Sequence, residues 1–289
     1  MKKTTLISIM ICSIILNITA CYGINSGEMF FAKNIKGNGI RKELDRGKME
    51  FTAIETRGSI DVIISKNTDA PIKVSGDENL LEYVETYVKD GVLNIHFNNK
   101  EFNSFSTRIG LKVTVPNNGR INNIKASGSS DVMTEGTVVA DNMSITCKGS
   151  SDFNGNIKAG KCEINCSGSS DFKGSIVAEN CEIDCSGSSD FKGSLEAKTC
   201  ILKFRGSSDC TISGKADVCE MTLAGSSDFK GYDFVVNKLT CSASGSSDVK
   251  VTCNEELNVK ASGSSDVYYR GSAKIISKDT SGSSDVINR

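Results

Sequence analysis

Apolar and polar residues alternate along much of the second half of the chain, and the alternation recurs at a nearly constant interval. Between the apolar residues Cys162, Ile164 and Cys166, for example, stand two polar residues. A period of two is that of a β-strand with one buried and one exposed face, whereas a helix needs apolar residues three and four apart. The pattern therefore predicts half-buried strands.

A tetrapeptide, Gly-Ser-Ser-Asp, follows these alternating segments and occurs nine times. Successive copies are 18 to 21 residues apart, and five of the eight intervals are 19 residues. An apolar residue or Cys follows each Asp and opens a second alternating segment, so each repeat is predicted to be a strand, this turn, a second strand and a second turn. The nine aspartates of these turns are candidate site residues: Asp131, Asp152, Asp171, Asp190, Asp209, Asp228, Asp248, Asp266 and Asp285.

A constant period of about 19 residues predicts an all-β fold, a parallel β solenoid (β-helix) over residues 119–289, in which each repeat makes one lap. Neighbouring laps would stack about 4.8 Å apart and pair their backbones. One lap cannot bury its inward side chains alone, so the stack has to bury them as continuous ladders. The main alternative is an antiparallel meander, which would need no constant full-lap period.

Residues 46–118 are predicted to form a small N-terminal β-rich unit that caps the solenoid. Within it, the stretch from Arg57 to Val62 looks like a degenerate copy of the repeated turn, and Lys89-Asp90-Gly91 is typical of a hairpin turn. A cap is expected because an open end strand invites edge-to-edge association, and none is evident at the C-terminal end. Residues 21–45, which are polar and contain glycine, are predicted to be a tether.

The first residues resemble a bacterial export signal. Lys2 and Lys3 precede an apolar run, from Leu6 to Ile18, that is too short to span a bilayer as a mature helix. The run ends in Ile18-Thr19-Ala20-Cys21, which resembles the lipobox of bacterial lipoproteins. That resemblance implies a signal peptide at residues 1–20 and a diacylglycerol on the thiol of Cys21, which would hold the chain on a membrane. The alternative is an ordinary signal peptide with a chance cysteine.

Charge and cysteine content narrow the class of protein. The formal net charge of −1 argues against nucleic acid as a partner. Of the 12 cysteines, ten lie in the repeats, mostly at inward positions, where a free thiol behaves as a small hydrophobe. Some disulfides remain an alternative in an oxidising compartment, although in-register parallel neighbours lack the facing Cβ vectors of a disulfide. A metal site is a third alternative, without the usual zinc-ligand spacing.

The inventory of reactive side chains argues against an enzyme. The chain has one histidine, His96, which alternates with Asn94 and Asn98 and is expected to face solvent without a role. A catalytic triad needs a base between serine and acid, and the glycines repeat as turns instead of forming a phosphate-binding loop. Stacked carboxylates are a possible glycosidase arrangement, but nine similar copies favour a structural role. No cofactor is predicted.

The stacked aspartates need partners, because like charges repel unless something satisfies them. The simpler hypothesis is local: each carboxylate accepts hydrogen bonds from Ser hydroxyls and turn amides, as in Asx turns. The alternative is calcium between the laps. Calcium prefers six to eight oxygen ligands, and one Asp with two Ser per repeat supplies few.

Taken together, these residues resemble the putative auto-transporter adhesin, head GIN domain family, common in Bacteroidetes. The resemblance is carried by Gly37-Asn38-Gly39, the stretch from Phe51 to Val62, Asp90 to Ile95, and the segment from Ile124 to Val132. It implies a β solenoid in the cell envelope, as an outer-membrane lipoprotein, and it suggests adhesion.

Two functional hypotheses follow from the sequence. The first is a non-enzymatic envelope lipoprotein that binds an unknown protein or glycan ligand through its repetitive surface. The second is a structural or assembly protein of the periplasm or outer membrane, which forms a homo-oligomer through the uncapped end of the solenoid.

Overall fold

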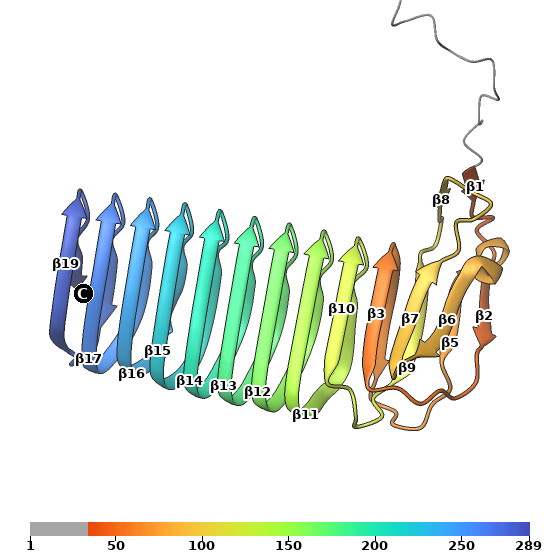
Figure 1. The fold of residues 1–289 in the computed structure, drawn as a ribbon, viewed down its shortest axis with the longest axis horizontal. Helices are drawn as coiled ribbons and strands as arrows, with labels where there is room; N and C mark the ends of the chain where they lie inside the picture. The colour runs from red at the N-terminus through yellow and green to blue at the C-terminus, as the bar shows by residue number, and fades with distance from the viewer. Residues whose placement is uncertain (1–33) are drawn as a thin grey trace, which may run out of the picture.

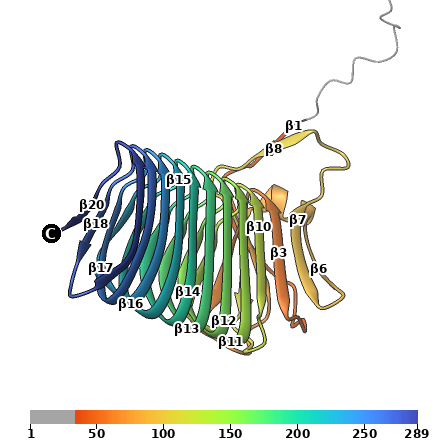
Figure 2. The same cartoon turned by 60° about the vertical axis from the view of Figure 1, so that its left-hand side comes forward.

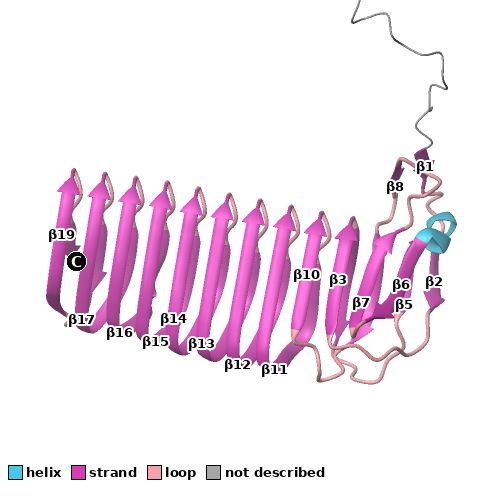
Figure 3. Ribbon diagram, viewed as in Figure 1, coloured by secondary structure: helices cyan, strands magenta, loops and turns pink. Residues whose placement is uncertain are grey.

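The computed structural model describes residues 34–289, and it is a parallel β solenoid built almost entirely of strands (Figure 1). The predicted all-β solenoid with laps of about 19 residues is therefore confirmed. Among the described residues the only helical segment is the short 3-10 helix η2 (Glu78–Tyr83), which lies beside the first strands (Figure 3). The long strands that form the laps are β11 (Val132–Gly149), β12 (Phe153–Gly168), β13 (Phe172–Gly187), β14 (Phe191–Gly206), β15 (Cys210–Gly225), β16 (Phe229–Gly245) and β17 (Val249–Gly263).

Each lap is one long bent strand closed by a tight turn. Strand β12 pairs with β13 in parallel and in register, so that Phe153 lies beside Phe172 and Gly168 beside Gly187. Figure 2 shows the resulting flattened coil, in which two faces of strands meet at tight turns along one edge and at smooth bends along the other. The sequence predicted a second turn at the bend. That prediction was wrong, because the strand runs through the bend and pairs with its neighbour on both sides of it.

The core lies between the two faces of the coil and consists of ladders of equivalent side chains. One ladder contains the rings of Phe153, Phe172 and Phe191, which stack with centroids 5.2 Å apart. The ten cysteines of the repeats are all buried and unpaired in the structure. Burial raises the pKa of the Cys241 thiol to about 12, so this side chain is an uncharged part of the core.

The solenoid continues into the N-terminal unit. Strands β3 (Ala53–Gly58) and β4 (Ile60–Ser65) pair in parallel with β10 (Asn123–Gly128) and β11, as another lap would. The turn at Gly58 is thus the degenerate copy that the sequence indicated. Strands β7 (Val92–Phe97) and β9 (Leu111–Pro116) add one further parallel layer, on β3 and β4 respectively.

Antiparallel strands close the N-terminal end of the stack. Strand β6 (Val84–Lys89) pairs with β7, and β5 (Lys73–Asp77) pairs with β9. The predicted hairpin joins β6 to β7, with φ of 52° at Asp90 and 77° at Gly91. A β-rich cap is therefore present, and its reversed strands end the parallel ladder.

The predicted tether was wrong over residues 34–45. These residues form β1 (Asn34–Lys36) and β2 (Arg41–Asp45), and β2 pairs antiparallel with β5. The pairing gives the backbone of this polar segment its hydrogen bonds, which its own sequence does not specify. The predicted signal peptide, Cys21 and residues 22–33 lie outside the described residues. Within residues 34–289 no helix has the length and apolar character needed to cross a membrane.

The C-terminal lap differs from the others in its inward positions. Strand β19 (Lys274–Gly282) pairs with β17, while β18 (Val267–Arg270) pairs with β20 (Val286–Asn288). In β19, Lys278 and Thr280 lie beside the core residues Val259 and Ala261. Two inward columns therefore end in polar side chains, whereas the column of Leu257 ends in Ile275, which is 38% exposed.

Candidate functional site

Glycine is required at the first position of each repeated turn. Gly168 has a φ of 91°, and a Cβ atom at this position would lie 2.6 Å from the carbonyl oxygen of Gly149 in the preceding lap. Only glycine adopts this backbone conformation without strain, and only glycine allows neighbouring laps to approach so closely.

The second serine of each turn is buried and links neighbouring laps. The backbone N–H of Ser151 donates to Oγ of Ser170, and the N–H of Ser170 donates to Oγ of Ser189, across 3.2 and 3.1 Å. These serines are fully shielded from solvent. Because the turn amides point along the stack where no carbonyl meets them, the hydroxyl supplies the acceptor that a buried amide needs.

The nine candidate aspartates form a single column on the outside of these turns. The predicted hydrogen bonds within each turn are not formed: among residues 34–289 no Ser hydroxyl donates to these carboxylates, and the turn amide that a carboxylate accepts belongs to the next lap, as where the N–H of Asp171 donates to Oδ1 of Asp152 across 2.9 Å. The column begins one lap earlier than predicted, because Asp61 accepts the N–H of Asp131. Burial and the neighbouring carboxylates raise the pKa of Asp152, although the amide bond opposes the shift.

Lysines beside the column balance part of its charge. Nζ of Lys230 lies 3.1 Å from Oδ2 of Asp209 and 3.9 Å from Oδ2 of Asp228. Over residues 34–289, no group of three or more His, Cys, Asp or Glu side chains is arranged to hold a metal ion. The amide bonds between laps and the neighbouring lysines thus supply partners for the carboxylates of the column.

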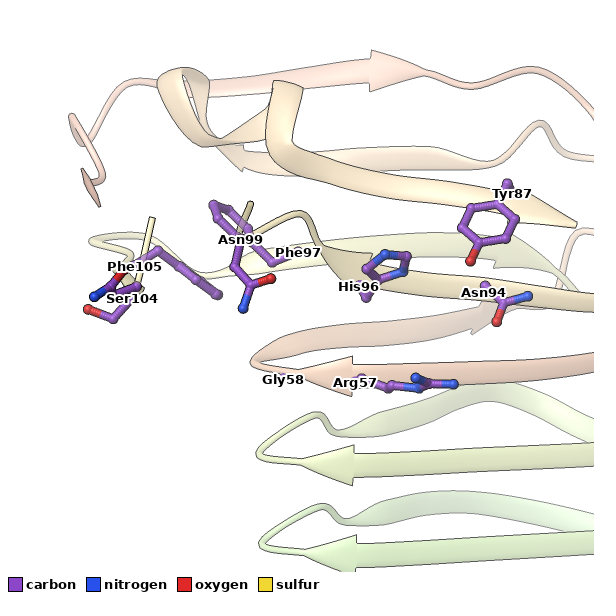
Figure 4. Close-up of a pocket in the computed structure, with 10 residues that line it drawn as sticks. Arg57, Gly58, Tyr87, Asn94, His96, Phe97, Asn99, Ser104 and Phe105 are labelled. Carbon is purple, nitrogen blue, oxygen red and sulfur yellow. The ribbon is translucent and has the colours of Figure 1, made fainter. Parts of the chain in front are cut away.

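A groove with a volume of about 580 Å³ opens in the N-terminal unit, where the repeated columns are interrupted (Figure 4). Its floor is made by outward side chains of β3, β6 and β7, among them Arg57, Tyr87 and Asn94. Its far wall comes from residues 99–105, which lead into β8 (Ser104–Ser106). Residues distant in sequence thus share one surface because β3, β6 and β7 are neighbours in the sheet.

The floor of the groove is held by contacts among its polar and aromatic side chains. Nε2 of His96 lies 3.0 Å from Oε2 of Glu85, while Nδ2 of Asn98 donates to the other carboxylate oxygen. The Tyr87 ring meets the His96 ring edge to face, with centroids 5.8 Å apart. Tyr87 is 44% exposed, so one side of its ring is available to a ligand.

The wall of the groove is anchored by β1. The rings of Phe97 and Phe105 stack with centroids 3.9 Å apart, and Oγ of Ser104 donates to Oδ1 of Asn34. The hydroxyl of Ser104 is therefore used in a hydrogen bond with β1, and the imidazole of His96 lies against the carboxylate of Glu85. A serine, histidine and acid in hydrogen-bonded sequence, as acyl transfer requires, is not formed by the residues that line this groove.

The sequence placed His96 on an outward face, as observed, but assigned it no role and did not identify the groove. One signal was available. The single histidine of the sequence, His96, lies at an outward position of β7, whereas the repeats of the solenoid contain no histidine. A residue type that the repeats lack marks the place where the surface ceases to repeat.

Comparisons with known proteins agree with this architecture. The model of a family described as putative auto-transporter adhesin, head GIN domain, matches residues 50–176 and again residues 163–273. A search of curated proteins returns no match.

Solved structures from two Parabacteroides species have the same fold. A putative adhesin from Parabacteroides merdae is 21% identical, with a TM-score of 0.65 over 89% of this chain and 100% of that chain. A putative adhesin from Parabacteroides distasonis is 22% identical, with a TM-score of 0.68 over 88% and 100%. A putative lipid binding protein from the same species is 23% identical, with a TM-score of 0.64 over 89% and 100%.

Proposed function

The chain belongs to the family described as putative auto-transporter adhesin, head GIN domain, and from this premise we propose that it is a non-enzymatic binding protein of the cell envelope. It is held on a membrane by a lipid at Cys21, and it binds its ligand in the groove of the N-terminal unit.

The uniqueness of the groove carries this proposal. The turns of the solenoid repeat nearly unchanged from lap to lap, so a ligand that recognised one turn would meet the same contacts on the next. Within residues 34–289 the lining of the groove belongs to the N-terminal unit and not to a repeated lap, and it combines an exposed aromatic ring with several amides. Concave sites with a few fixed polar groups are where proteins bind small ligands.

The lining suits a neutral glycan. Sugar rings present C–H faces that pack on aromatic rings such as Tyr87, and their hydroxyls pair with amides such as Asn94 and Asn99. The charged groups nearby already have partners: Arg57 pairs with Glu55, and the Glu85 carboxylate accepts a hydrogen bond from Nδ2 of Asn98 and lies 3.0 Å from Nε2 of His96. One similar structure is of a putative lipid binding protein, but the open, amide-rich groove of this chain fits a sugar better than an acyl chain.

Ligand binding is tested with a panel of neutral oligosaccharides, measured by calorimetry on the purified protein. Tyr87→Ala and Asn94→Ala should each weaken binding by roughly tenfold or more, as truncation of a central contact does. Tyr232→Ala and Asn165→Ala are matched controls on the solenoid and should leave affinity unchanged. Absence of binding across the panel, or equal losses in the controls, would contradict the groove as the site.

Placement in the envelope is tested separately in the native host. Mass spectrometry of the mature protein should show a diacylglycerol on Cys21. Cys21→Ser should remove this lipid, and the protein should then no longer be found in the membrane fraction. Protease treatment of intact cells, with lysed cells as the control, then distinguishes the two faces. Digestion on intact cells supports adhesion, whereas protection until lysis supports a periplasmic ligand.

A further inference from the structure

The far wall of the groove depends on one short strand. Residues 98–110 connect β7 to β9, and the strand within this connection, β8, pairs with β1. Among residues 34–289 these two strands form a sheet of their own, apart from the 18-stranded sheet that holds the other strands. Figure 2 shows them together, projecting from the laps. Within the described part of the chain, the wall therefore has its only strand partner in the three residues of β1.

The two ends of the wall are fastened independently of β1. At one end the buried ring of Phe102 meets the Tyr83 ring edge to face, with centroids 4.9 Å apart. At the other end the fully buried carboxylate of Asp77 accepts the hydroxyl of Thr107. Residues 103–105, which line the groove, lie between these two fixed points. Their position therefore depends on what holds the middle of the wall.

Strand β1 holds the middle of the wall. Ile35 lies opposite Phe105 in the register of the two strands, and both side chains are partly buried against the core. The Phe105 ring, which stacks on Phe97, thus has Ile35 as its neighbour on β1. The hydroxyl of Ser104 donates to Oδ1 of Asn34 across 2.6 Å. Separation of β1 from β8 would remove these contacts together with the hydrogen bonds of the strand pair.

The two ends of β1 are held unequally. After the strand, Gly37 lies so close to the buried carboxylate of Asp77 that no Cβ atom would fit, and Nδ2 of Asn79 donates to the carbonyl oxygen of Lys36 across 2.9 Å. At the start of the strand, the side chain of Asn34 makes one exposed hydrogen bond to the wall. Short elements with exposed hydrogen bonds open at low free energy. We expect β1 to separate from its first residue and the separation to stop at Gly37.

We propose that β1 is a latch on the groove: its pairing with β8 closes the wall, and its release opens the wall and weakens ligand binding. This regulation rests on the proposed function, in which the groove binds the ligand. A ligand that contacts the wall binds the closed state better, so it stabilises the pairing of β1 by the same factor by which the pairing strengthens binding. A partner that binds or displaces β1 therefore changes the affinity of the groove.

Hydrogen exchange of the purified protein, followed by mass spectrometry, tests the latch without a ligand. Ile35→Ser removes the apolar contact with Phe105 and should speed exchange of the amides of residues 103–106 by roughly threefold or more. Lys36→Ser is the matched control on the same strand, because the Lys36 side chain is exposed, and it should leave this exchange unchanged. Equal exchange of residues 103–106 in the two variants overturns the proposal. Unchanged exchange in β12 shows that the solenoid of each variant is folded.

The coupling to the groove is measured with maltotetraose, laminaritetraose and mannotetraose as neutral probes. The probe that binds most tightly should bind Ile35→Ser roughly threefold more weakly than Lys36→Ser, and at saturation it should slow exchange of β1 in the unmodified chain. Equal affinities of the two variants, or exchange of β1 that the saturating probe leaves unchanged, overturns the coupling and leaves the groove as the binding site. Failure of all three probes to bind contradicts the proposed glycan function and the coupling with it, whereas the exchange of residues 103–106 alone decides whether β1 holds the wall.

Discussion

The hydroxyl oxygen of Ser170 accepts the backbone N–H of Ser151 from the preceding lap, across 3.2 Å. The same bond recurs along the stack, so each turn completes the hydrogen bonding of a neighbour rather than its own. The tetrapeptide therefore supplies hydrogen bonds between neighbouring laps at the turn, where the strand ladder is interrupted.

Removing one of these hydroxyls should destabilise the solenoid. Ser170→Ala leaves the buried N–H of Ser151 without an acceptor, and the expected loss is about 1–3 kcal/mol in the free energy of unfolding. Ser169→Ala is the control, because Ser169 is exposed and its backbone N–H donates to the carbonyl of Gly149 in either case. Urea unfolding measures both, and similar losses in the two variants would contradict the role assigned to the buried hydroxyl.

The charge of the aspartate column should be dispensable, whereas its acceptor oxygen should not. Asp152→Asn keeps an oxygen for the N–H of Asp171 and removes repulsion from neighbouring carboxylates, so stability at neutral pH should be equal or higher. Asp152→Ala loses the acceptor and should cost about 1 kcal/mol. Thermal unfolding at pH 7 compares the two, and a loss in Asp152→Asn as large as in Asp152→Ala would show that the charge itself is required.

The pH dependence of the same variant has a definite sign. The pKa of Asp152 is raised above 3.8 in the folded protein, so the folded state binds this proton more tightly than the unfolded chain does. Ionisation therefore costs stability as pH rises from about 4 through the raised pKa, and the cost persists above it. The advantage of Asp152→Asn should shrink as pH falls through the raised pKa, and it should be absent below about pH 4.

Asp77 should make the opposite contribution. Burial opposes ionisation, but hydrogen bonds from Thr107 and from the amides of Gly39 and Arg108 outweigh it and lower the pKa to about 2. A lowered pKa contributes stability above the unfolded value of 3.8, and that stability is lost as pH falls through about 2. Asp77→Asn should therefore lower the unfolding midpoint at pH 7, and the difference from the unmodified chain should narrow between pH 4 and pH 2.

The control for this measurement is Asp69→Asn, which alters an exposed carboxylate paired with Lys48. It should change the midpoint little at any pH, as exposed ion pairs contribute little. A difference between Asp77→Asn and the unmodified chain that stays constant down to pH 2 would contradict the assigned ionisation.

The polar side chains of the last lap should keep the solenoid from associating through its end. Lys278→Val with Thr280→Ala restores the apolar columns of Val259 and Ala261, and it should produce concentration-dependent association in size-exclusion chromatography and light scattering. Lys260→Val with Thr222→Ala, on an outer face, is the control. A monomer at all concentrations would show that these polar residues do not restrict assembly.

The sequence was sufficient for the solenoid, because alternation and period act through local rules that every lap repeats. The burial of Ile164 between two less buried polar residues follows directly from the pleat of a strand. The bend inside each lap was predicted to be a turn because the sequence of one lap does not show its pairing. The parallel ladder with the next lap continues through the bend, and only that ladder identifies it as strand.

Features that depend on distant partners were missed. The segment from Arg41 to Asp45 has a single apolar residue, and it becomes a strand because β5 supplies its hydrogen bonds. The groove was not predicted because Arg57 lies on β3 and Tyr87 on β6. These strands share one surface only because β7 pairs with both of them. Local patterns predict repeated contacts well and predict unique contacts poorly.

The in-register stacking of laps has a consequence for how such a chain can vary. Since every lap enters and leaves at equivalent points, a whole unit such as residues 153–171 can be removed or duplicated while the two ends keep their own structures. Each such event would move the far end by about 4.8 Å relative to the groove. The length of the solenoid can therefore change in steps of one lap, while the structures at its two ends are preserved.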